Sequence, residues 1–99
     1  NHISDDKNMQ QQNEKLLQLS LKLGEILKEL RKNRSELTLE KLAYEYDIPK
    51  GTLSKIERGK QKCQFVNLWK ISEAIGIRCS DIVKMLEEKM GDDCTLIDE

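Results

Sequence analysis

Apolar residues recur at spacings of three and four along most of the chain, the pattern of helices that bury one face. The first such stretch covers residues 16–30, where charged residues lie between the apolar positions. Gly24 interrupts this stretch at a point where a helix can break or start afresh, because Gly costs ~1 kcal/mol relative to Ala in a helix interior. Residues 1–13 lack the pattern and are almost wholly polar, so we expect a flexible N-terminal tail there.

Two short helices follow. Thr38 is a suitable N-cap for the first, and Leu37 and Leu42 occupy the positions of a hydrophobic staple around it. Pro49 ends this helix, because the residue before a proline is disfavoured in helical geometry, and opens the next one. Gly59 is expected to end that helix in the left-handed conformation.

Two more helices are predicted in the second half of the chain. Residues 65–75 have apolar positions at helical spacing and are followed by Gly76. The pair Ser80-Asp81 is expected to cap a last helix, which stops at Gly91. Since no segment of useful length alternates with the period of a strand, the pattern predicts an all-α chain of five short helices.

Length and composition limit the class of protein. Ninety-nine residues allow one domain, which we expect over residues 14–90, with an acidic C-terminal tail over residues 91–99. No apolar run approaches the ~20 residues that span a bilayer, and no signal peptide precedes the domain, so we expect a cytoplasmic protein without membrane contact. The three cysteines are odd in number and widely spaced, and the only histidine is His2. Reduced thiols, no metal and no cofactor are the expectation.

The net charge of −1 argues at face value against a nucleic-acid partner. The charges are nevertheless unevenly distributed along the chain. Residues 49–62 hold five cations and one anion, whereas residues 81–99 hold seven acids and two lysines. The chain is therefore expected to be polarised, with a net +4 segment that could face DNA and a net −5 segment at the other end.

The basic segment belongs to two short helices joined by a three-residue turn, the arrangement of a helix-turn-helix. Residues 23–77 resemble the lambda-repressor/Cro type of this motif, also called the XRE family. The residues that carry the resemblance are Leu42-Ala43, Ile48 after the turn, Leu53-Ser54-Lys55-Ile56-Glu57-Arg58-Gly59, and residues 68–75. The resemblance implies a compact five-helix lambda-repressor-like DNA-binding domain, here with an extended N-terminal helical segment.

By this resemblance, residues 50–58 form the helix that enters the major groove. The candidate base-reading residues are Lys50, Gly51, Ser54 and Lys55. The candidate phosphate-binding residues are Thr52, Arg58, Lys60 and Lys62. A lysine donates readily to guanine O6 and N7, so we expect a G within each half-site.

The resemblance also implies a structural ion pair between Arg31 and Glu57, which would withdraw Glu57 from the DNA surface. Trp69 is expected to be a core or interface anchor rather than a ligand-stacking residue. Three positions depart from the family pattern. Leu39 stands where a phosphate-binding Gln is common, Asp47 replaces the turn glycine, and Cys63 replaces a proline before the fourth helix.

These observations favour a sequence-specific transcriptional regulator of bacterial or phage type. It would bind a palindromic operator as a homodimer, with recognition helices ~34 Å apart. The fifth helix or residues 16–23 would supply the dimer contact. No effector-binding domain fits beside the motif, so the output would be simple occupancy, as in small repressors or restriction–modification controller proteins.

The sequence also bears on two other classes of function. An enzyme is disfavoured, because the chain has no catalytic His, nucleophile elbow or P-loop. The alternative is a protein-interaction module, such as an antitoxin or adaptor with the same fold. Leu39 and the acidic tail favour this alternative, and Lys50 and Lys55 oppose it.

Overall fold

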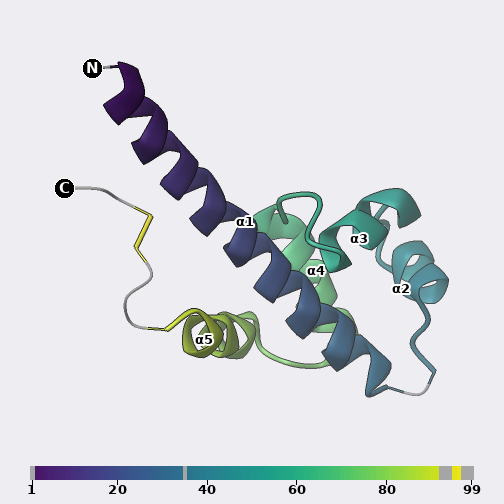
Figure 1. Cartoon of the computed structure of the whole chain (residues 1–99). Helices are drawn as coiled ribbons and strands as arrows, with labels where there is room; N and C mark the ends of the chain where they lie inside the picture. Colours follow the sequence, from purple (N-terminus) through teal and green to yellow (C-terminus); the bar gives the residue numbers. More distant parts are fainter. Residues whose placement is uncertain (1, 35, 92–94, 97–99) are drawn as a thin grey trace.

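The chain folds into five helices, described here from a computed structural model that covers residues 2–34, 36–91 and 95–96, with side chains from residue 14 onward. The helices follow one another as α1 (His2–Lys32), α2 (Leu39–Glu45), α3 (Lys50–Glu57), α4 (Phe65–Ile75) and α5 (Cys79–Met90) (Figure 1). The described residues contain no strand. The predicted all-α, five-helix class is confirmed.

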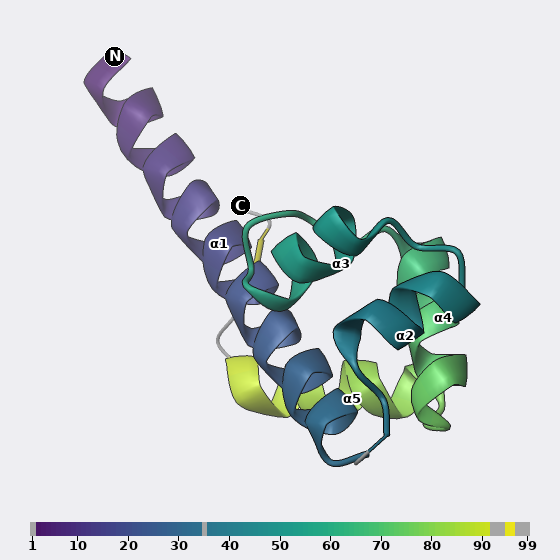
Figure 2. The ribbon, with the colours of Figure 1, turned by 90° about the vertical axis from the view of Figure 1, so that its right-hand side faces the viewer.

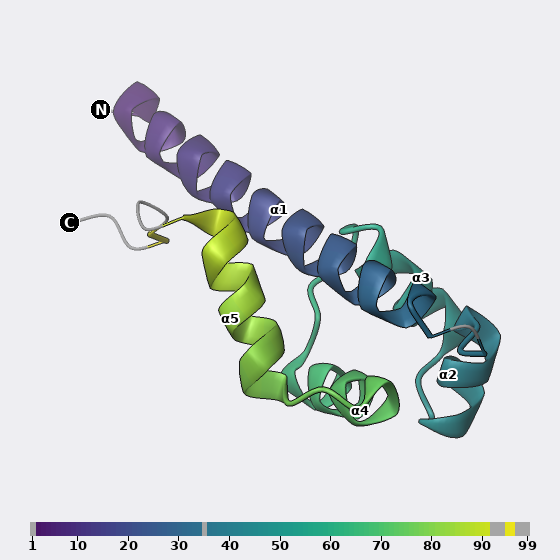
Figure 3. The same cartoon turned by 90° about the horizontal axis from the view of Figure 1, so that it is seen from below.

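Helix α1 differs from its prediction at its start and in its middle. It begins at His2, so it includes most of the segment that was expected to be a flexible tail, and it passes through Gly24 without a break. Its N-terminal half extends beyond the rest of the domain, and α3, α4 and α5 pack against its C-terminal half (Figures 1 and 3). The boundaries at residues 14 and 90 stay predictions.

Gly24 is where α1 crosses α3. A Cβ atom at this position would lie 2.5 Å from the carbonyl oxygen of Ile56 and 2.6 Å from that of Glu57. Both are backbone atoms, which cannot rotate away as a side chain can. The glycine is therefore present to permit close packing of two helices.

Helices α2 and α3 form as expected from their local signals. The Thr38 hydroxyl accepts a hydrogen bond from the Lys41 N–H at 3.1 Å, which confirms the predicted N-cap. Asp47 has a φ of 54°, so it adopts the left-handed conformation in place of the usual turn glycine. Pro49 lies just before α3 as its N-cap, and Gly59 follows α3 with a φ of 72°.

The predicted cap of α5 is wrong. The helix begins at Cys79 with Arg78 as its N-cap residue, and the Arg78 side chain makes no capping hydrogen bond. Ser80 and Asp81 therefore lie inside the helix. Asp81 still stabilises the start of the helix, because its negative charge interacts favourably with the positive end of the helix dipole.

The core is formed by apolar side chains from all five helices and the turn between α2 and α3. Helix α1 contacts α3, α4 and α5, and α2 packs on α3. The buried apolar residues are Ile26, Leu27, Leu42, Ala43, Ile48, Leu53, Ile56, Leu68, Ile71, Ile75 and Ile82. These contacts fix the position of α3 in the domain.

Candidate nucleic-acid interface

Helix α3 is held from one side and free on the other. Leu53 and Ile56 are almost fully buried, and Leu42 of α2 is buried with them. Figure 2 shows α2 and α3 next to each other, apart from the protruding half of α1. Because these buried side chains fix the angle between the two helices, the outer face of α3 is presented as a rigid surface.

The predicted base-reading residues lie on this outer face. Lys50, Gly51 and Lys55 are exposed, and Ser54 is half-buried. The spacing places Ser54 and Lys55 about one helical turn after Lys50 and Gly51, so the four share one side of α3. No atom lies within 4 Å of the place where a Gly51 Cβ would be, so the backbone can approach a ligand closely there.

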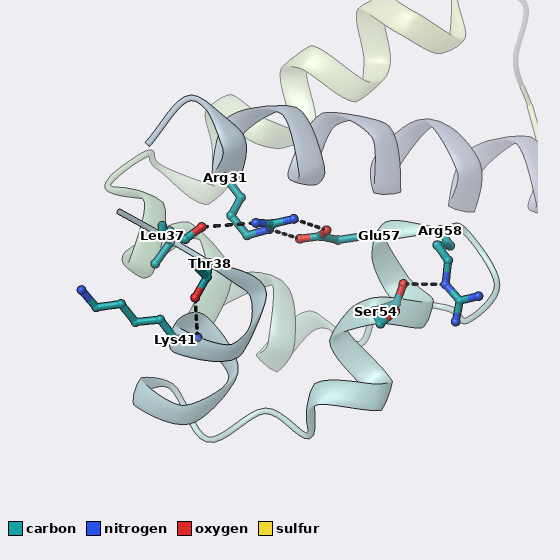
Figure 4. A network of polar contacts seen from close by, with 7 residues as sticks. All are labelled: Arg31, Leu37, Thr38, Lys41, Ser54, Glu57 and Arg58. Carbon is teal, nitrogen blue, oxygen red and sulfur yellow. Dashed lines mark hydrogen bonds and ion pairs between the residues drawn. The ribbon is translucent and has the colours of Figure 1, made fainter. Parts of the chain in front are cut away.

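The predicted phosphate-binding residues extend from α3 into the following loop. Arg58, Lys60 and Lys62 are exposed, and Thr52 is half-buried. The Arg58 Nε donates to the Ser54 carbonyl oxygen at 3.3 Å, which lays this guanidinium along the end of α3 (Figure 4). Within the described part of the chain, no carboxylate pairs with any of these three cations.

Glu57 is the single acid among residues 49–62, and it points away from this surface. Its carboxylate accepts from Arg31 Nε at 2.7 Å and from Arg31 Nη2 at 3.0 Å (Figure 4). Arg31 Nη1 also donates to the Leu37 carbonyl oxygen at 3.2 Å. The predicted pair of Arg31 and Glu57 is thus present, and it joins α1, the start of the α2 segment and α3.

This pair is mostly hidden from water. The side chains of Arg31 and Glu57 are 12% and 6% exposed. The hydrogen bond to Glu57 is the main cause that raises the pKa of Arg31, against an opposing effect of burial. The negative charge of Glu57 is therefore neutralised inside the domain, and the outer side of α3 keeps an excess of positive charge.

A second ion pair, which the sequence did not reveal, lies on the exposed side. Lys50 Nζ is 3.1 Å from Oε1 of Glu40 on α2. The turn between these helices is also tied to α4, because Lys70 Nζ donates to the Asp47 carbonyl oxygen at 3.2 Å. The only signal in the sequence was an acid near the start of α2, and its partner depends on how α2 and α3 meet.

The three departures from the family pattern have different structural consequences. Leu39 packs against the core and offers no polar group to a ligand. Asp47 is exposed at the turn. Cys63 is half-buried, and burial, with a smaller effect from nearby Cys79, raises its pKa to about 11. Cys63 and Cys79 are free thiols, and Cys94 lies outside the described residues.

Trp69 is not a core residue, because 52% of it is exposed. Its ring lies 5.9 Å from that of Phe65, at an angle of 58°, and Val66 is exposed beside them in the sequence. We call Phe65, Val66 and Trp69 the α4 apolar patch. Of the two roles expected for Trp69, the interface role is the one compatible with this exposure.

Two further features are absent from the described residues. They contain no group of three or more His, Cys, Asp or Glu side chains that could hold a metal ion. No helix among them is both long and apolar enough to cross a membrane.

Comparison with known proteins agrees with this geometry. Residues 27–82 match the model of the helix-turn-helix family. Control protein C.MunI of Mycoplasma sp is 35% identical over 71 residues, which cover 72% of this chain and 96% of that protein. Control protein C.BamHI of Bacillus amyloliquefaciens is 34% identical over 65 residues, 66% of this chain and 80% of that protein. The chain belongs to the XRE-type helix-turn-helix family and is a DNA-binding transcriptional regulator, not an enzyme.

Proposed function

We propose that this regulator binds a palindromic operator as a homodimer, with α3 of each copy in the major groove. The observation that carries the proposal is the charge of the α3 surface. Lys55, Arg58 and the loop lysines are exposed with no carboxylate partner in the described structure, while Glu57 is neutralised inside the domain. Lysines at the leading edge of a helix suit guanine in the major groove.

The start of α4 supports a phosphate-binding role for the loop. The N-cap residue Gln64 makes no side-chain bond to the first turn, and that turn contains no acid. Backbone N–H groups at a helix start attract phosphate. Together with Lys60 and Lys62, they would fix the register of the protein on the duplex without reading its sequence.

The names of the two relatives support a control function. Both are called control proteins, and one of them aligns over nearly its whole length with this chain. We propose that this chain likewise controls gene expression, and that occupancy of the operator is its output.

The dimer contact is assigned to the α4 apolar patch. The two contacts expected from the sequence, α5 and residues 16–23, meet in one groove that includes Leu19, Val83 and Leu86. Part of α5 already packs on the core, however, since Ile82 is fully buried and Met85 and Leu86 pack against the core while partly buried. The α4 apolar patch is more exposed and contains aromatic rings, the side chains that are enriched at interface hot spots.

Selection of bound DNA from a random pool tests the proposed function. We expect enrichment of a palindrome with a G in each half-site. Affinity for this site is expected to fall by about 10³ or more between 50 and 200 mM salt if some six phosphates are contacted. Failure to enrich any palindrome would reject the operator proposal and favour the protein-interaction role.

Two lysine variants separate base reading from phosphate binding. Lys55→Ala should relax base choice at one position of each half-site and cost about 1–3 kcal/mol on the preferred site, because Lys55 lies on the outer face of α3. Lys60→Ala should weaken binding to all sequences alike, because its loop position suits a phosphate contact. Titrations with the selected site and with single-base variants provide the measurement. An equal loss on every sequence from Lys55→Ala would contradict its base-reading role.

A further inference from the structure

The proposed base-reading lysines are not equivalent in the free protein. Lys50 is held by a carboxylate, with its Nζ 3.1 Å from Glu40 Oε1, whereas Lys55 has no such partner among the described residues. The two members of the pair come from different helices of the motif. Their side chains are 59% and 69% exposed, so the pair lies at the surface that would face DNA.

We propose that Glu40 is a specificity-determining residue, which keeps the Lys50 ammonium at the base edges and away from the phosphate backbone. This inference rests on the proposed base-reading role of α3. Glu40 acts through Lys50 and is thus a positioning residue. It provides an orienting carboxylate from α2, next to Leu39, whose side chain is apolar and packs against the core.

The chemistry of lysine explains what such a restraint does at the start of α3. Its ammonium is a point charge on a flexible four-carbon stem, so an unrestrained Lys50 at the start of α3 could swing to a phosphate on any sequence. An ammonium has three donors. One can stay on Glu40 while the others are directed at guanine O6 and N7, and a free lysine would have to lose more conformational freedom to adopt that geometry.

The same pair lowers binding to non-specific DNA. While Lys50 is paired with Glu40 it displaces no counterion from the backbone, so the pair reduces what Lys50 adds to sequence-independent affinity. The pair is also exposed and therefore weak, so it does not prevent Lys50 from bonding to a correctly placed guanine. Glu40 therefore widens the ratio between specific and non-specific binding.

The test is Glu40→Gln in the full chain, with binding to the selected operator and to random duplex measured from 50 to 300 mM salt. On random duplex, the slope of log K against log salt should steepen by about 0.9, because Lys50 becomes one additional phosphate contact. Taken relative to about 1 M salt, a slope steeper by about 0.9 corresponds to an affinity gain of about fivefold at 0.15 M salt. Affinity for the operator should change less, so the specificity ratio falls.

Two controls isolate the action through Lys50. Glu45→Gln removes the same charge from the same helix, but Glu45 is exposed and makes no ion pair with any described residue. It should leave the slope on random duplex unchanged. In a Lys50→Ala background, Glu40→Gln should no longer change the slope, because the side chain that it releases is absent.

The outcomes separate this inference from the proposed function. If Lys50→Ala relaxes base choice while Glu40→Gln leaves the slope and the specificity ratio as they are, the role of Glu40 is rejected and the operator proposal stands. Equal slope changes from Glu40→Gln and Glu45→Gln would also reject it, since a general charge effect would then suffice. If Lys50→Ala leaves base choice intact, the base-reading role of Lys50 fails, and the role of Glu40 fails with it.

Discussion

At the scale of single residues, the charge of the DNA-facing surface depends on where one carboxylate is placed. Glu57 belongs to the most basic segment of the chain but is 6% exposed, and it meets Arg31 through two hydrogen bonds. If it faced outward, it would repel phosphates beside Arg58 and Lys60. The ion pair thus contributes both to the packing of α1 on α3 and to the positive charge outside.

Glu57→Gln should lower the free energy of unfolding by about 1–3 kcal/mol, because it leaves the mostly buried Arg31 without an ionised acceptor. Chemical denaturation at neutral pH measures the change. Glu25→Gln is the matched control, since it breaks an exposed pair with Lys89 at 3.4 Å and should cost less than about 1 kcal/mol. Equal losses from the two variants would contradict the importance assigned to burial.

At the scale of helices, replacing a glycine by alanine has opposite effects on stability in different places. In an exposed helix interior, Gly→Ala stabilises by about 1 kcal/mol. In α1 the backbone of α3 occupies the space that a Gly24 Cβ would need, whereas a Gly51 Cβ in α3 would meet nothing within 4 Å. The close crossing of α1 and α3 depends on Gly24.

We therefore expect Gly24→Ala to lower the free energy of unfolding by about 1–3 kcal/mol, since the helices must separate to admit the methyl group. Gly51→Ala should instead raise it by up to about 1 kcal/mol. Thermal denaturation of both variants gives the comparison. A stabilised Gly24→Ala variant would show that α1 and α3 pack less closely than the structure indicates.

At the scale of the whole molecule, the basic loop that holds Lys60 and Lys62 and the α4 apolar patch are neighbours along the chain. The α4 apolar patch begins three residues after Lys62. A two-fold contact through this patch would bring the phosphate-binding loops of both copies close to the symmetry axis.

Trp69→Ala should shift the protein from dimer to monomer, because truncation of a hot-spot aromatic costs about 2 kcal/mol or more, about a 30-fold weaker association. Sedimentation velocity over a concentration series measures this shift, with circular dichroism to confirm that the helices are retained. Val83→Ala, in the groove between α1 and α5, should leave the dimer intact. If Val83→Ala disrupts the dimer and Trp69→Ala does not, the dimer contact lies in that groove instead.

Much of the fold could be predicted from the sequence, because the signals are local. Helix order, the Thr38 cap and the left-handed Gly59 follow from residue spacing and backbone preference within a few positions. The start of α5 was predicted wrongly, since Ser80 and Asp81 are good caps by type while the helix already begins at Cys79. The pairing of Arg31 with Glu57 came from the family resemblance and not from any local pattern.

The sequence by itself determined the fold class, the family and the polarised distribution of charge, because each is encoded in residue types and their spacing. Tertiary structure alone decided that Gly24 permits a helix crossing, that Trp69 is exposed, and that Lys50 is held by Glu40. These features depend on distances between atoms of different helices. Such distances are set only when the buried faces pack together, so the spacing of residues along the chain does not predict them.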